Sequence, residues 1–146
     1  MTRKALVLLA TVALIVVAAS AVAAAATPTV HTQSASFSKA HLEPVDGSGV
    51  HGTVLLFQLP SEGTLIVVFA KDLKPGKRYV SLYYDNDHCA LGPYSEDDVI
   101  GGPYTAIAGG FGFTTGAADD DLDEINSVSV RSARSFRLLA CATVQH

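Results

Sequence analysis

The sequence predicts one all-β domain, and three observations lead to this fold class. Short runs rich in Val, Leu, Ile, Phe and Tyr follow one another along the chain after residue 26. Clusters of Gly, Pro, Asp and Ser separate these runs, and no helical periodicity of useful length occurs beyond the N-terminal segment. Seven or so short strands with turns at such spacing are typical of an antiparallel sandwich or barrel.

Seven candidate strands account for most of the domain. They cover residues 34–40, 50–58, 64–71, 78–84, 104–113, 125–131 and 137–145. The early strands are separated by Asp46-Gly47-Ser48-Gly49, by Pro60-Ser61-Glu62-Gly63 and by Lys74-Pro75-Gly76. Pro75 and Gly76 suit a type II turn, because proline presets the first central residue and glycine accepts a positive φ at the second. Residues 95–124 are expected to form an irregular excursion that is glycine-rich in its middle.

Two of these strands have a period of two that indicates their faces. In the 78–84 strand, Val80, Leu82 and Tyr84 alternate with Tyr79, Ser81 and Tyr83. We expect the first set to point inward. In the 125–131 strand, Val128 and Val130 oppose Ser127, Ser129 and Arg131. Each strand is therefore predicted to have one apolar and one polar face.

The N-terminal segment predicts export. Arg3 and Lys4 precede an unbroken apolar run from Ala5 to Val17, and an alanine-rich stretch ends near Ala26. This is the layout of a secretory signal peptide, cleaved near Ala26. Residues 27–146 then form a single β-sandwich domain that is secreted to the extracellular space or the periplasm. The run is also long enough to span a bilayer, so an uncleaved membrane anchor is the competing interpretation.

Charge and cysteine content narrow the class further. Without Arg3 and Lys4, eight basic residues face 14 acidic ones, a net charge of −6 that does not attract nucleic acid. Cys89 and Cys141 are the two cysteines, and export places them in an oxidising space, where one intramolecular bridge is expected. Such a bridge constrains the unfolded chain by about 4 kcal/mol on a loop-entropy treatment. Two buried free thiols are the alternative.

Four short motifs occur along the chain, and both their residues and their order are informative. They are Gly47-Ser48-Gly49-Val50-His51-Gly52-Thr53-Val54, Leu73-Lys74-Pro75-Gly76, Cys89-Ala90-Leu91-Gly92-Pro93 and Phe136-Arg137-Leu138-Leu139-Ala140-Cys141. They resemble the opening hairpin, the turn before the copper-ligand strand, the cysteine segment and the closing strand of the copper/zinc superoxide dismutase fold family. The resemblance implies a Greek-key β-sandwich of about seven to eight strands. It also implies a disulfide that ties a long loop to the last strand.

The same resemblance says where metal ligands belong, and other residues stand there. The family's two copper histidines after the turn fall on Ser81 and Tyr83, its bridging histidine on Tyr94, and its fourth copper histidine on Arg131. Its zinc histidines belong within residues 95–124, which contain none, and its substrate-guiding arginine is approximated by Arg137, one residue out of register. Hydroxyls and a permanently protonated guanidinium do not replace imidazoles around copper. The four positions are therefore predicted to be converted metal sites.

The resulting expectation is a superoxide dismutase-like pseudoenzyme with no catalytic residues, no metal and no cofactor. It is expected to be a binding or structural module with an unknown protein or glycan partner, without nucleic acid, and with membrane contact only if the N-terminal segment is uncleaved. A chordin-type secreted sandwich domain is a related possibility. The alternative is a divergent copper/zinc metalloprotein with superoxide dismutase activity.

The remaining candidate residues are interpreted conservatively. The five histidines are His31, His41, His51, His88 and His146. No pair has the tight spacing of a zinc site, although His41 and His51 could meet across a hairpin. The acidic run 119–124 lacks the interleaved glycine of a calcium loop and is expected to be solvated. In Asp85-Asn86-Asp87 the side chains are expected to form a turn.

Overall fold

The computed structural model describes residues 36–93 and 95–146, and within them the chain is all-β. The predicted signal peptide and Tyr94 lie outside the described residues. Eight strands and one short 3₁₀ helix, Glu96–Asp98, follow one another along the chain. The strands are β1 (Phe37–Pro44), β2 (His51–Gln58), β3 (Thr64–Lys71), β4 (Arg78–Tyr84), β5 (Tyr104–Thr105), β6 (Gly112–Ala118), β7 (Ser127–Ser132) and β8 (Leu138–Thr143).

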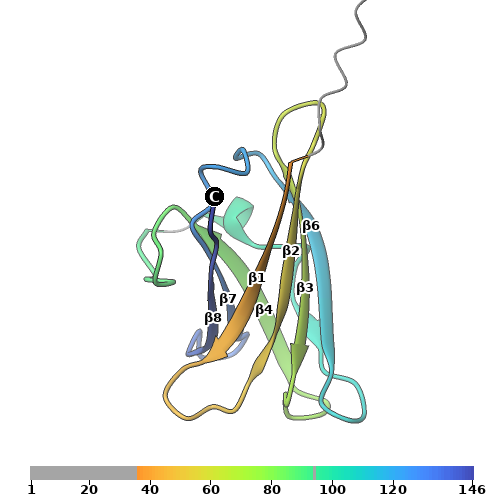
Figure 1. Ribbon diagram of the computed structural model, residues 1–146. Helices are drawn as coiled ribbons and strands as arrows, with labels where there is room; N and C mark the ends of the chain where they lie inside the picture. The colour runs from red at the N-terminus through yellow and green to blue at the C-terminus, as the bar shows by residue number, and fades with distance from the viewer. Residues whose placement is uncertain (1–35, 94) are drawn as a thin grey trace, which may run out of the picture. The chain divides into compact units, whose positions relative to one another are not determined.

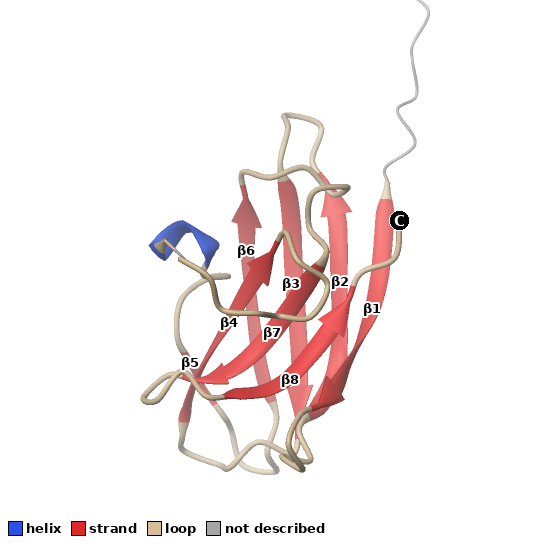
Figure 2. Cartoon of the chain, turned by 90° about the vertical axis from the view of Figure 1, so that its left-hand side faces the viewer, coloured by secondary structure: helices blue, strands red, loops and turns tan. Residues whose placement is uncertain are grey.

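The eight strands form one nearly closed antiparallel sheet in the order β5-β4-β7-β8-β1-β2-β3-β6. Figures 1 and 2 show β1, β2, β3 and β6 as one layer and β4, β7 and β8 as the other. β1 joins the two, because its first residues pair with β2, whereas Glu43 and Pro44 pair with β8. The sandwich-like all-β fold predicted from the sequence is thus confirmed. The Greek-key connection stays a prediction.

The main core fills the space between the layers. Alternate residues of β2 and β3 enter it, and the side chains of Val54, Leu56, Ile66 and Val68 are fully buried. Val128 and Val130 of β7 meet them from the other layer, as expected from their alternation. Burial of this many branched aliphatic side chains is the main source of stability, at about 2 kcal/mol for each.

A second apolar cluster lies on the other face of β4. It contains Val80, Leu82, Tyr84 and Cys89, with Val99 and Phe136 packed against it. The segment between β4 and β5 lies over this face and adds an isolated bridge between Leu82 and Val99. The predicted orientation of β4 was therefore wrong: Tyr79 and Tyr83 belong to the main core, and the set expected to point inward forms the second cluster. Both faces of β4 are buried, because the chain folds back over it.

Two other expectations about elements need correction. The run 104–113 was predicted to be one strand, but residues 106–111 form a turn between β5 and β6, with positive φ at Gly109 and Gly110. The region 95–124 was predicted to be irregular, yet it contains β6, which pairs with β3 from Thr64↔Ala118 to Ala70↔Gly112. In the described part of the chain, no helix has the length and apolar character needed to cross a bilayer.

Candidate functional site

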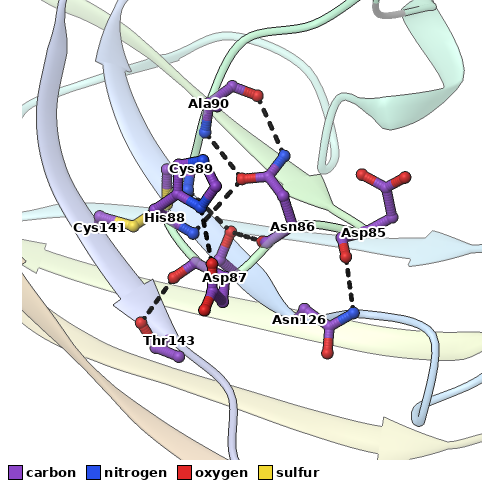
Figure 3. A network of polar contacts seen from close by, with 10 residues as sticks. Asp85, Asn86, Asp87, His88, Cys89, Ala90, Asn126, Cys141 and Thr143 are labelled. Carbon is purple, nitrogen blue, oxygen red and sulfur yellow. Dashed lines mark hydrogen bonds and ion pairs between the residues drawn. A yellow bond between two sulfur atoms is a disulfide. The ribbon is translucent and has the colours of Figure 1, made fainter.

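The predicted cysteine pair lies at the centre of the second cluster. The sulfur atoms of Cys89 and Cys141 are bonded at 2.08 Å, and Cys89 is almost completely buried. Cys141 is on β8, and Cys89 belongs to the loop after β4, so the bridge ties that loop to the last strand as the resemblance implies (Figure 3). Cys89 has a positive φ of 54°, a conformation that needs support from its surroundings.

Side-chain hydrogen bonds provide that support along residues 85–90 (Figure 3). The Asn86 side chain accepts from the backbone N–H groups of His88 and Ala90 and donates to the Ala90 carbonyl. Asn126 Nδ2 donates to the Asp85 carbonyl at 2.7 Å, and Thr143 Oγ1 donates to the Asp87 carbonyl at 2.9 Å. The turn expected from Asn and Asp side chains is confirmed here, and it holds Cys89 against the sheet.

Arg131 is the most unusual residue of the cluster, because a guanidinium that is only 5% exposed lies among apolar groups. It donates through Nη2 to the Cys89 carbonyl and through Nη1 to the Phe136 carbonyl, both at 2.7 Å. Its Nε donates to the Tyr84 hydroxyl at 2.8 Å, and its charge lies 5.8 Å from the centre of the Tyr84 ring. Backbone dipoles, a hydroxyl and an aromatic face thus stabilise this buried cation.

The hydrogen-bond chain continues from Tyr84 to β7. The Tyr84 hydroxyl and Ser129 Oγ lie 2.7 Å apart inside the protein. Because Arg131 Nε can only donate, the Tyr84 oxygen accepts from it, which leaves the phenolic proton for Ser129. From the sequence, Tyr84 was expected on the inward face of its strand and Ser129 on the polar face of another, and their contact was not predicted. Ser129 and Arg131 alternate with the core-facing Val128 and Val130, so the sequence does place these two polar side chains on the same face of β7.

Ser81 belongs to a different environment. Its side chain is fully buried on the core face of β4, and its Oγ lies 3.1 Å from the hydroxyl of Tyr104 on β5. Burial raises the pKa of Tyr104 to about 12, although the hydrogen bond with Ser81 opposes this effect. The Ser81 hydroxyl is therefore hydrogen-bonded to the neutral hydroxyl of Tyr104.

Tyr83 lies on the same core face as Ser81, at the end of β4 that leads to Asp85. Its pKa is raised to about 12, first by burial and then by the negative charges of Asp120, Asp98, Asp119 and Asp97. These carboxylates come from the β6–β7 loop and the 3₁₀ helix. Burial and the neighbouring carboxylates, Glu124 first, also raise the pKa of Asp120. Tyr83 keeps its proton through the neutral range in these surroundings.

The predicted converted positions do not come together in one site. Ser81 is paired in register with Val130 and faces the main core, whereas Arg131 is paired with Val80 and faces the second cluster. Tyr83 shares the face of Ser81, and Tyr94 lies outside the described residues. Arg131 lies on the other side of the sheet, because its partner Val80 points away from its neighbour Ser81 on the same strand.

The histidines that the structure describes are also apart. His41 is exposed on β1 and pairs in register with Thr53, so it does not meet His51. His51 Nδ1 lies 3.0 Å from Asp72 Oδ2, and His88 Nδ1 lies 2.6 Å from Asp87 Oδ1. A hydrogen bond with His88 lowers the pKa of Asp87. Among residues 36–93 and 95–146, no three His, Cys, Asp or Glu side chains are grouped to hold a metal.

The acidic run 119–124 is only partly solvated, contrary to expectation. Asp121 Oδ1 accepts from the Gly63 N–H at 2.9 Å and from Gln58 Nε2 at 2.7 Å, and these bonds lower its pKa. The Gln58 carbonyl oxygen in turn accepts from the N–H of the buried Leu122. Asp121 therefore fastens the β6–β7 loop to the β2–β3 turn, while its neighbours Asp119, Asp120 and Asp123 stay exposed.

No family model and no curated protein matches this chain. The likeness to the superoxide dismutase fold family therefore depends on the sequence motifs quoted above.

Proposed function

We propose that this chain is an exported, non-catalytic domain with a superoxide dismutase-like fold, acting as a binding or structural module of the extracellular space or cell envelope. The observation that carries the proposal is the environment of Arg131, which stands at one position where the resemblance calls for a copper histidine, while Ser81 and Tyr83, at two others, face the opposite side of the sheet. Its three hydrogen bonds and its contact with Tyr84 fill that position with a permanent cation. A fixed positive charge opposes the binding of a second cation beside it.

Two further features support an exported module. The disulfide suits an oxidising compartment such as the extracellular space. Phe69 of β3 and Phe113 of β6 are about half exposed on the outer face of the sheet, with ring centres 5.2 Å apart. Ile107, beside them in the β5–β6 turn, is 65% exposed. Apolar patches of this kind are typical of surfaces that bind other molecules.

The proposal is tested by metal loading. The exported protein is incubated with copper and zinc, freed from excess metal and analysed for metal content and superoxide removal, with a copper/zinc superoxide dismutase treated in parallel. We expect far less than one equivalent of copper and no activity above that of free buffer. Stoichiometric copper together with superoxide removal would establish the divergent metalloenzyme instead and overturn the proposal.

A further inference from the structure

Most basic residues of the described chain line one cavity. Of the ten lysines and arginines in the sequence, Arg3 and Lys4 precede the described residues. Arg131 is buried, and Lys39 and Lys71 lie on strands of the other layer. The other five line a cavity of about 500 Å³: Lys74, Lys77, Arg78, Arg134 and Arg137. This concentration is notable in a domain with a net charge of −6.

The cavity is built by three turns that meet at the lower end of the molecule in Figure 1. Ser48 and Val50 come from the β1–β2 turn, residues 72–77 from the β3–β4 turn, and Arg78 and Tyr79 from the start of β4. The β7–β8 turn, residues 133–137, completes it and is fastened to β4 by the hydrogen bond from Ala133 N to the Arg78 carbonyl, at 3.1 Å. A backbone hydrogen bond therefore holds the β7–β8 turn against the strand that follows the β3–β4 turn.

The five cations have no anionic partners within the described residues. Their side chains form no ion pair there, and the single acidic residue of the cavity wall, Asp72, is already paired with His51 at 3.0 Å. The carboxylates that raise the pKa values of Tyr83 and Asp120 lie at the other end of β4. That strand runs over seven residues, from Arg78 at the cavity to Tyr84. That length corresponds to roughly 20 Å. The positive charges of the cavity thus repel one another and remain open to an external anion.

The lining indicates which anion fits. Guanidinium groups bind phosphate and sulfate through two parallel N–H···O bonds, and lysines add point charges. The hydroxyls of Ser132 and Ser135 line the same wall and provide further donors. Val50 and Leu139 supply apolar surface, and a volume of about 500 Å³ is within the range of small-ligand sites. Five cations exceed the charge of a single phosphate or sulfate.

We propose that this cavity binds a ligand that carries two or more phosphate or sulfate groups. The inference rests on the proposed function and deepens it, because it names the ligand class of the binding module. Phosphate and sulfate share the chemistry that the cavity recognises, and a phosphorylated compound and a sulfated saccharide are its two sources. A compact cavity at one end of a sandwich does not follow the backbone of a long nucleic acid, which needs an extended basic stripe.

The test is calorimetric titration of the disulfide-intact exported protein with inorganic tripolyphosphate and, separately, with sucrose octasulfate. We expect saturable 1:1 binding of at least one probe, weaker at higher salt. Whichever probe binds more tightly identifies the phosphate or the sulfate source. The Arg134→Gln/Arg137→Gln variant should bind at least about tenfold more weakly, because the loss of one charged hydrogen bond alone corresponds to about a factor of ten.

The matched control is Lys39→Gln/Lys71→Gln, which removes the same charge outside the cavity and should bind almost as the unchanged protein does. Absence of saturable binding by both probes would overturn the inference, and so would equal weakening in the two double variants. Tighter binding to duplex DNA or to anionic vesicles would assign the surface to another partner and overturn it too. A failed titration leaves the metal-loading result unaffected, so the failure of this inference and that of the proposed function are distinguishable.

Discussion

At the scale of single residues, Arg131 connects parts of the chain that are distant in sequence. It donates to the carbonyls of Cys89 and Phe136, so one side chain joins the disulfide loop to the β7–β8 turn. A buried guanidinium is costly unless its donors are satisfied, and here Nε, Nη1 and Nη2 each have an acceptor. Burying the guanidinium costs desolvation energy, and its hydrogen bonds in return fix the Cys89 loop and the β7–β8 turn relative to each other.

We expect Arg131→Met to lower the free energy of unfolding by about 3 kcal/mol, because it leaves buried carbonyl groups without donors. Urea denaturation monitored by circular dichroism measures the change. Arg134→Met is the control, since Arg134 is exposed and its replacement should alter stability by less than about 0.5 kcal/mol. Equal, small effects of both replacements would contradict the role given to Arg131.

A second prediction at this scale concerns Asp121 and the pH dependence of stability. Its pKa in the folded protein lies below the ordinary value of 3.8, chiefly because of the Gly63 N–H, with the Gln58 amide second. A depressed pKa contributes stability above the unfolded pKa, and this contribution is lost as the pH falls through the folded pKa. The melting temperature of the unchanged protein should therefore fall more steeply below about pH 4 than that of Asp121→Asn.

The control for this pH dependence is Asp123→Asn, because Asp123 lies in the same β6–β7 loop and is exposed to solvent. Thermal unfolding is followed at several pH values for all three proteins. If Asp121→Asn and Asp123→Asn have the same acid dependence, the Gly63 and Gln58 bonds do not carry the effect.

At the scale of elements, the segment between β4 and β5 behaves as part of the core. It covers Val80, Leu82 and Tyr84, and Val99 packs with them. The disulfide closes a loop with a sequence separation of 52 residues. We expect Cys89→Ser/Cys141→Ser to lose about 4 kcal/mol of unfolding free energy on the loop-entropy treatment, and residues 85–103 to become sensitive to protease.

Limited proteolysis and urea denaturation under non-oxidising and oxidising conditions measure these two effects. The unchanged protein treated with reductant is the matched control and should behave like the double variant. A double variant as stable and as protease-resistant as the oxidised protein would show that the loop is held by its other contacts alone.

The strands show how far sequence patterns reach at this scale. The bounds of β3 and β4 were predicted correctly, because proline and glycine turns lie on both sides of β3 and before β4, and the polar run Asp85-Asn86-Asp87 follows β4. The run 104–113 was misinterpreted, since its apolar residues hid the turn at Gly109 and Gly110. The facing of β4 was also wrong. Alternation separates two faces, but when tyrosines on one side and aliphatic residues on the other are all buried, it does not say which face meets the core.

The candidate sites were less predictable than the strands, for a physical reason. The cysteine pair followed from count and compartment. The partners of Arg131 did not, because a carbonyl in the Cys89 loop and one at Phe136 become neighbours only after folding. The basic cavity was missed in the same way. Lys74 and Arg134 are 60 residues apart in sequence, and only the pairing of β4 with β7 brings their turns together.

At the scale of the whole molecule, positive and negative charges are separated along the direction of β4. Basic turns gather at the end where β4 begins, and the acidic 3₁₀ helix and β6–β7 loop lie where it ends. Such a separation of charge orients a molecule in the field of a charged partner. The basic end and the acidic end of the domain therefore attract partners of opposite charge.

The N-terminal segment supplies the prediction for the complete chain. We expect the exported protein to begin near Thr27, because the small residues around Ala26 suit cleavage after a signal peptide. N-terminal sequencing of protein recovered outside the cytoplasm measures the start. Recovery of the uncleaved chain from the membrane fraction would support the anchor interpretation and contradict the prediction.

The covered outer face of β4 also decides where this chain tolerates change. The Asp46–Gly47 turn is exposed, and an added Cβ at Gly47 meets no atom within 4 Å. A peptide tag inserted there lengthens a surface turn at a modest entropic cost. The same tag inserted at Ala90 displaces the layer that keeps water from Leu82, Tyr84 and the disulfide. In protein engineering, the parts of this segment that carry Cys89 and Val99 therefore count as packed structure, although they form almost no regular secondary structure.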